Sequence, residues 1–318
     1  MSEEWAVVAS QKQRELPMTG YVRLSETVKA SLIAMGLQIH PSSRLAKYDR
    51  SLASLLRTRL TSSSADDETL RVAARAFTEL WQLAAIAHYA QTSGADREFR
   101  DKTRTLMQDA ALPANEPAAA STPGRDVQFE LFVAASWSAG GVPCMLRQPP
   151  GPDLTLTLGS FDVGLEVKCI KSIASLADRL QKADKQISLL SSGGVVMTDL
   201  SPVVTNNLLY MTASSARKAV PDLERRLKTL MFSHLDTARR KVRPARTFGW
   251  IGYCQALYLC ADAPPLLVYQ WKNLNLGSGR DHRWLSLVAA LPRLVVGPEA
   301  VLSSLSISSV NLDRRIAR

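Results

Sequence analysis

Cysteine and histidine are scarce in this 318-residue chain, and neither is spaced for the sites that it usually builds. The four cysteines are scattered, which argues against a disulfide framework. No Cys-x-x-Cys pair is present, so a zinc site of that type is not expected. No histidine has a partner at metal-binding spacing, and no serine or cysteine lies in a nucleophile-elbow sequence. We expect buried free thiols at Cys144, Cys169, Cys254 and Cys260.

Long apolar runs are also absent. The chain contains no stretch of about 18 uncharged apolar residues, the length that marks a membrane-spanning helix. Its first residues are acidic and lack the basic-then-apolar order of a signal peptide. We therefore expect no membrane contact and a cytoplasmic location.

Acidic residues are outnumbered by basic ones. The chain has 39 Lys and Arg against 29 Asp and Glu, a formal net charge of +10, with a pI near 9.6. This balance favours a polyanionic partner such as nucleic acid, although many basic proteins bind none. The densest cluster, the basic run, either contacts phosphates or is a solvated surface. It comprises Arg239, Arg240, Lys241, Arg243 and Arg246, of which the first four are the candidates for contact with nucleic acid.

The stretch 151–171 carries the most information. It alternates apolar and polar residues on both sides of Gly159-Ser160, which predicts two strands joined by a type II′ turn. That turn sets Leu158 opposite Phe161, Leu156 opposite Val163, and Leu154 opposite Leu165. Apolar residues meet at every pair, so the register is internally consistent.

The same register gathers charge on the polar face of the hairpin. Asp153 falls opposite Glu166, with Cβ atoms about 5 Å apart, and Lys168 projects from the same face. Adjacent carboxylates repel each other unless a positive charge lies between them. Mg²⁺ suits such a pair, with Mn²⁺ able to substitute, and the lysine could act on water or on a phosphate. These three residues form the hairpin triad.

The hairpin resembles the PD-(D/E)xK nuclease superfamily, in which a Pro-Asp pair and a Glu-x-Lys triplet carry the active site. The matching residues are Pro152, Asp153, Glu166 and Lys168. The resemblance implies a restriction-endonuclease-like αβββαβ core between residues 125 and 200. A helix at 126–139, a strand at 142–147, a helix at 173–191 and a strand at 195–200 fit that order.

The resemblance also implies further site residues. Glu130, on the helix before the hairpin, would support the metal directly or through water, and the Val167 carbonyl would be a ligand. Gln186, on the helix after the hairpin, would position water or phosphate. Lys182 lies one helical turn from Gln186 and is a second candidate on that face, for nucleic-acid contact.

The chain as a whole is expected to be α/β, with a mixed sheet and an all-helical N-terminal domain. We place that domain at 1–112, a Pro- and Ala-rich linker at 113–124, and the nuclease-like domain with a C-terminal extension at 125–318. One long helix is predicted at 221–240, a hairpin from 250–260 and 266–271, and short closing elements at 285–291 and 301–305. The helical domain could mediate homo-oligomers or partner contact.

These observations lead to a Mg²⁺-dependent nuclease that hydrolyses phosphodiester bonds, with DNA favoured over RNA, in phage defence or DNA repair. The alternative is a catalytically inactive nucleic-acid-binding or scaffolding protein with the same fold. An RNA-directed nuclease is a third hypothesis. Solvent-facing polar residues on a strand are common in proteins without any site, so the triad alone does not decide between them.

Overall fold

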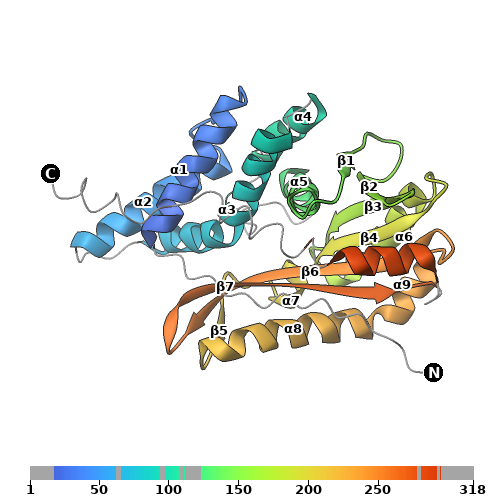
Figure 1. Cartoon of the computed structure of the whole chain (residues 1–318). Coiled ribbons are helices and arrows are strands. Elements are labelled where there is room, and N and C mark those ends of the chain that lie inside the picture. The colour runs from blue at the N-terminus through green and yellow to red at the C-terminus, as the bar shows by residue number, and fades with distance from the viewer. Residues whose placement is uncertain are drawn as a thin grey trace.

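The protein is a mixed sheet covered by helices on both faces, as seen in a computed structural model (Figure 1). The structure describes residues 18–61, 66–93, 97–107, 111, 123–277, 281–291 and 294. The predicted linker, apart from its last two residues, and the predicted closing element at 301–305 lie outside these ranges. The α/β class with a mixed sheet is confirmed.

Four helices are described in the N-terminal region that the sequence predicts to be helical. They are α1 (Met18–Ala34), α2 (Arg44–Thr61), α3 (Asp67–Ser93) and α4 (Arg97–Leu106). Helix α3 is buried along its centre, where it meets α1 and α2 as well as α5 and β6.

The order helix, strand, hairpin, helix, strand predicted for the middle of the chain is present. It comprises α5 (Pro123–Ala139), β1 (Cys144–Leu146), β2 (Leu154–Leu158), β3 (Phe161–Cys169), a 3-10 turn (Ile173–Ser175), α6 (Leu176–Ile187) and β4 (Gly194–Asp199). Helix α5 begins at Pro123, inside the predicted linker, since proline is well tolerated in a first helical turn. Helix α6 ends before the predicted residue 191, because Ser188 to Gly193 form turns.

The β2–β3 hairpin has the predicted register. Leu154 pairs with Leu165, Leu156 with Val163, and Leu158 with Phe161. Only Gly159 and Ser160 remain in the loop, and Gly159 has a φ of +63°. A two-residue turn of this hand needs that positive φ, which glycine adopts without steric strain.

The later strands extend the sheet in a partly parallel arrangement. The elements after β4 are α7 (Ser201–Val204), β5 (Met211–Ala213), α8 (Ala216–Ser233), α9 (Leu235–Lys241), β6 (Thr247–Cys260) and β7 (Ala263–Asn275). Strand β4 runs parallel to both β3 and β6. Strand β7 pairs antiparallel with β6 over almost its whole length, so β4 and β5 share the opposite edge of β6. The predicted C-terminal hairpin is confirmed.

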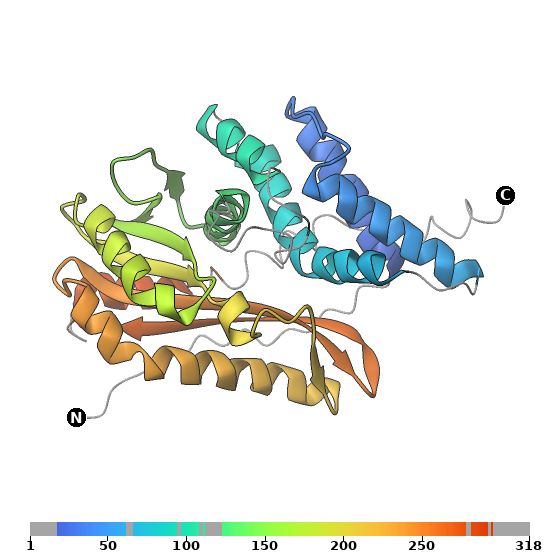
Figure 2. The same ribbon diagram turned by 180° about the vertical axis from the view of Figure 1, so that it is seen from behind.

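Side-chain alternation divides the sheet into two apolar faces. Val163, Leu165 and Val167 of β3 join the core that contains α5 and α3, whereas Ile170 joins the core beneath α6 and α8. The views from both sides show α8 along one face and α5 with α3 on the other (Figure 1, Figure 2). Because successive strand residues point to opposite faces, Glu166 and Lys168 project away from the α5 core.

The N-terminal helices share their core with the sheet. The Trp81 ring of α3 stacks on Tyr269 of β7, with ring centroids 4.8 Å apart, and meets the edge of Phe132 of α5. Its Nε1 donates to Gln255 Oε1 on β6 at 2.7 Å. Helix α3 is therefore packed into the same apolar core as the sheet, on the face that also holds α5.

The predicted long helix at 221–240 is wrong in its bounds. Helix α8 starts at Ala216, ahead of Pro221, and the chain breaks at His234 before α9 begins. The break lets Leu235 and Ala238 of α9 bury in the core under α6. Among the described residues, no helix combines the length and the apolar character needed to cross a bilayer.

Candidate active site

The hairpin triad converges at the start of β2 and the end of β3. Asp153 and Glu166 continue the register of the hairpin, and Lys168 Nζ lies between their carboxylates. The ammonium is 3.5 Å from Asp153 Oδ2 and in close contact with Glu166 Oε1. The predicted gathering of two acids and one amine is therefore present.

Main-chain hydrogen bonds fix the orientation of both carboxylates. The Val167 amide donates to Asp153 Oδ2 at 2.9 Å, and the Asp153 amide donates to Glu166 Oε2 at 3.1 Å. The Arg147 amide donates to the Asp153 carbonyl at 2.9 Å, which holds Asp153 beside β1. These bonds arise because each carboxylate faces the backbone of the opposite strand. At Val167 the amide contacts the site, and the role of its carbonyl as a metal ligand stays a prediction.

Burial and mutual repulsion disturb the ionisation of Glu166. Its side chain is 0% exposed, and burial, together with the charge of Asp153, raises its pKa to about 8. Burial acts to lower the pKa of Lys168, but attraction by Asp153 and Glu166 outweighs it and raises that pKa. The Glu166 carboxylate therefore depends on a nearby cation to remain charged.

Glu130 lies close to the triad without joining it. Burial and the charge of Asp153 raise the pKa of Glu130 to about 7. Its Oε1 pairs with Lys102 Nζ of α4 at 2.6 Å. The sequence analysis missed Lys102, because nothing in the sequence indicates that α4 packs beside α5 at this point.

The second predicted helix residue, Gln186, supports the hairpin from α6. Its Nε2 donates to the Gly151 carbonyl at 3.5 Å, next to the Pro152-Asp153 pair. Lys182, one turn earlier, is exposed on the same helix. Gln186 is thus near the site through the backbone of the loop that carries Asp153.

The basic run divides into two parts. Arg239, Arg240 and Lys241 are exposed in the last turn of α9. Arg243 is held by Asp184 of α6, since its Nε donates to Asp184 Oδ2 at 2.8 Å and its amide to Oδ1 at 3.0 Å. Arg243, which is itself exposed, therefore links α9 to α6, and this contact places Arg239, Arg240 and Lys241 beside the helix that bears Lys182 and Gln186.

The donor set of the triad suits a hard divalent cation. Asp153 and Glu166 provide adjacent carboxylate oxygens, and Mg²⁺ is commonly held by one or two carboxylates with waters and a substrate phosphate. Within the described ranges no group of three or more His, Cys, Asp or Glu side chains could hold a metal together. Such a cation would displace Lys168 from between the two acids.

None of the family models, curated proteins or solved structures compared with the chain gives a match.

Proposed function

We propose that this chain is a divalent-metal-dependent nuclease with a restriction-endonuclease-like core, acting on phosphodiester bonds of DNA. The observation that carries the proposal is the convergence of Asp153, Glu166 and Lys168 on one hairpin. The element order α5, β1, β2, β3, α6 and β4 supports the αβββαβ core that the resemblance to PD-(D/E)xK nucleases implies.

Each residue of the triad has a distinct task in this proposal. Asp153 and Glu166 hold the cation, and their orientation is set by the backbone of the opposite strand. When bound, Mg²⁺ or Mn²⁺ supplies Lewis-acid stabilisation of the charge that develops on the phosphate. Lys168 Nζ, released from the carboxylates, donates hydrogen bonds to the attacking water or to a phosphate oxygen. Gln186 steadies the loop that carries Asp153.

The basic surface next to the hairpin would contact the phosphates along the DNA backbone. Lys182 on α6 and the exposed residues Arg239, Arg240 and Lys241 on α9 lie on helices that pack together. Lysine and arginine side chains bind phosphates by replacing condensed counterions, independent of sequence. The site and the basic surface therefore share α6 as a common support.

One observation favours the alternative of an inactive nucleic-acid-binding or scaffolding protein. Lys168 already contacts both carboxylates, so their repulsion is relieved without a metal. A protein that never binds the cation could therefore keep this triad at little energetic penalty. The two functions differ in one measurable property, which is cleavage.

The deciding experiment is cleavage of supercoiled plasmid with Mg²⁺, with Mn²⁺ and with EDTA. We expect nicked or linear product with either metal, none with EDTA, and a loss of at least about 100-fold for Lys168→Ala. Asp153→Asn should behave in the same way. Asp162→Asn is the matched control, because Asp162 lies on the same face of β3 but bonds to Thr157, at 2.9 Å, and not to a member of the triad within the described part of the chain.

The results separate all three readings. A wild-type protein that shifts DNA in a gel yet cuts no DNA with any divalent metal supports the inactive alternative and refutes the nuclease. Faster cleavage of single-stranded RNA than of DNA supports the RNA-directed enzyme. Equal loss of activity in Asp162→Asn and Lys168→Ala would show that the triad has no special role.

A further inference from the structure

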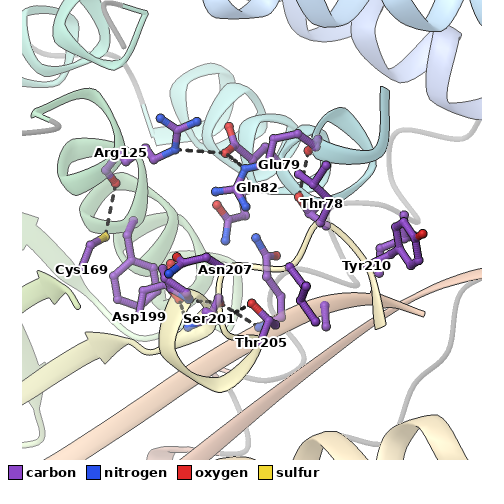
Figure 3. Close-up of a pocket in the computed structure, with 18 of the residues that line it drawn as sticks. Thr78, Glu79, Gln82, Arg125, Cys169, Asp199, Ser201, Thr205, Asn207 and Tyr210 are labelled. Carbon is purple, nitrogen blue, oxygen red and sulfur yellow. Dashed lines mark hydrogen bonds and ion pairs between the residues drawn. The ribbon is translucent and has the colours of Figure 1, made fainter. Parts of the chain in front are cut away.

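A cavity of about 530 Å³ lies away from the hairpin triad, between α3 and the carboxyl ends of β3 and β4. Figure 3 shows Thr78, Glu79 and Gln82 of α3 along one side of it, and Asp199, Ser201 and Thr205 opposite them. Its volume is in the range of small-molecule sites, about 300–1,000 Å³. The carboxyl ends of parallel strands are also where α/β proteins commonly bind ligands.

The cavity has an excess of positive charge. Four cations and two carboxylates line it, namely Arg71, Arg75, Arg125, Lys171, Glu79 and Asp199. The lining residues therefore carry two more positive than negative charges when both carboxylates are ionised, and Arg71 also pairs with Asp67 at 3.1 Å, outside the lining. Glu79 is shared further, because Arg44, which is 1% exposed, also pairs with it at 3.1 Å. Arg44 and Arg125, whose side chains are 1% and 11% exposed, are thus held largely out of water, where a bound anion would stabilise them.

Polar groups on the floor of the cavity are held in fixed orientations. Asp199 Oδ1 accepts from the amide of Ser201 at 2.8 Å and from its hydroxyl, and Ser201 Oγ accepts from the Gln255 amide at 2.9 Å. On the opposite wall, Gln128 Nε2 donates to Gln82 Oε1 at 2.6 Å. Buried amides and hydroxyls arranged in this manner provide directional contacts for a ligand.

Apolar side chains complete the wall after α7. Leu208, Leu209 and Tyr210 line the cavity, and Tyr210 is 48% exposed although it is a large aromatic residue. The preceding residues Asn206 and Asn207 have φ values of +53° and +59°, so the chain turns sharply to present this segment. An exposed aromatic ring beside a charged cavity is suited to stacking on a flat heterocycle.

We propose that this strand-end cavity binds a nucleoside phosphate. The phosphate would lie among Arg71, Arg75, Arg125 and Lys171, the four cations that line the cavity. The base would lie against Tyr210 and Leu208, with its polar edge toward the amides of Gln82 and Asn207. A ligand with both a multiple negative charge and a flat polar ring uses every part of the lining.

The cavity is separate from the hairpin triad but is built on the same elements. Cys169 lines the cavity, whereas its neighbour Lys168 points to the other face of β3. Gln128 and Phe129 of α5 line it one turn or less from Glu130. The proposal does not depend on nuclease activity, since ligand binding can be measured without any cleavage.

Isothermal titration of the full chain with ATP, AMP, adenosine and pyrophosphate tests the proposal. We expect saturable binding of ATP or AMP, with adenosine and pyrophosphate each at least about tenfold weaker. Arg71→Ala combined with Lys171→Ala should weaken nucleotide binding by about tenfold or more. Both side chains lie at the surface of the cavity, and unchanged thermal melting would show that the variant is folded.

Two matched variants complete the design. Lys218→Ala removes an exposed lysine from α8 on the other face of the sheet and should bind ATP as the wild type does. Lys168→Ala should also bind ATP normally, which separates this site from the proposed active site. No saturable binding of either nucleotide would overturn the proposal. Pyrophosphate binding as tight as ATP binding, or equal affinity in the Arg71/Lys171 variant, would overturn it too.

Discussion

Replacing Glu79 by glutamine should destabilise the fold more than any other single charge removal in α3. The Glu79 carboxylate lies 3.1 Å from Arg44 Nη1, 2.5 Å from Arg75 Nε and 3.4 Å from Arg125 Nε. It also accepts the Tyr48 hydroxyl at 2.7 Å. One buried anion therefore holds three guanidinium groups from α2, α3 and α5 together.

The expected loss is about 3–5 kcal/mol of unfolding free energy, the range for removing one partner of a buried ion pair. Glutamine keeps the size and one hydrogen-bond acceptor, so the change isolates the charge. Glu79 is 2% exposed and Arg44 1%, which leaves water little access to the stranded cations. Arg75 is 23% exposed and can turn toward solvent, so we expect a value near the lower end, about 3 kcal/mol.

Urea unfolding followed by circular dichroism measures this loss. A change of about 3 kcal/mol lowers the midpoint by roughly 1 M for a typical denaturant dependence. Glu68→Gln is the control, since Glu68 is exposed in the first turn of the same helix. The control should stay within about 0.5 kcal/mol of the wild type. Equal midpoints for the two variants would refute the reasoning.

The pH dependence of stability independently tests whether the charged form of Glu79 stabilises the fold. Burial acts to raise the pKa of Glu79, but Arg44, Arg75 and Arg125 outweigh it and hold the pKa well below its usual range. A carboxylate with a lowered folded pKa stabilises the protein above its unfolded pKa, and this stabilisation is lost as pH falls toward the folded value. The difference in unfolding free energy between wild type and Glu79→Gln should thus be largest at pH 7 and should decrease below about pH 4.5.

Three further outcomes follow from the packing and the surface charges. Gly194→Ala should prevent folding or destabilise the protein by more than about 3 kcal/mol, because its Cβ would lie 2.0 Å from the Gly164 carbonyl oxygen. Soluble yield and melting temperature would measure this effect. Replacing Arg239, Arg240 and Lys241 by alanine should reduce the steepness of the slope of log DNA affinity against log salt concentration by up to about 2.7, without lowering stability. Arg243→Ala should instead lower stability by about 1–3 kcal/mol in urea unfolding, because it leaves Asp184 buried without this partner.

The hairpin could be predicted because its determinants are local. Alternating polarity, a glycine at the turn and matched apolar pairs all lie within 151–171, and together they specify the register that the structure has. The triad follows from that register, since cross-strand neighbours are fixed once the turn is known. The hairpin of β6 and β7 was also predicted, but without a register, and β7 begins at Ala263, inside the predicted loop.

Contacts between distant segments could not be predicted in this way. Arg243 was assigned to the nucleic-acid surface, and nothing in the sequence shows that its guanidinium also pairs with Asp184, 59 residues earlier in the chain. Lys102 reaches Glu130 only because α4 packs against α5. The sequence does not distinguish a solvated charged residue from a paired one, because the partner is set by tertiary packing.

Helix α3 contains a signal in its sequence that indicates packing partners on more than one side. Every residue from 78 to 87 is buried, and a helix that is apolar on all sides belongs inside a larger core. The run Leu80–Ala87 is almost wholly apolar and so indicates partners on both sides, which are α1 and α2 on one and the sheet on the other. The polar residues within such a helix must then find buried partners. Glu79 and Gln82 do so at the strand-end cavity, which therefore exists because α3 lies between two layers.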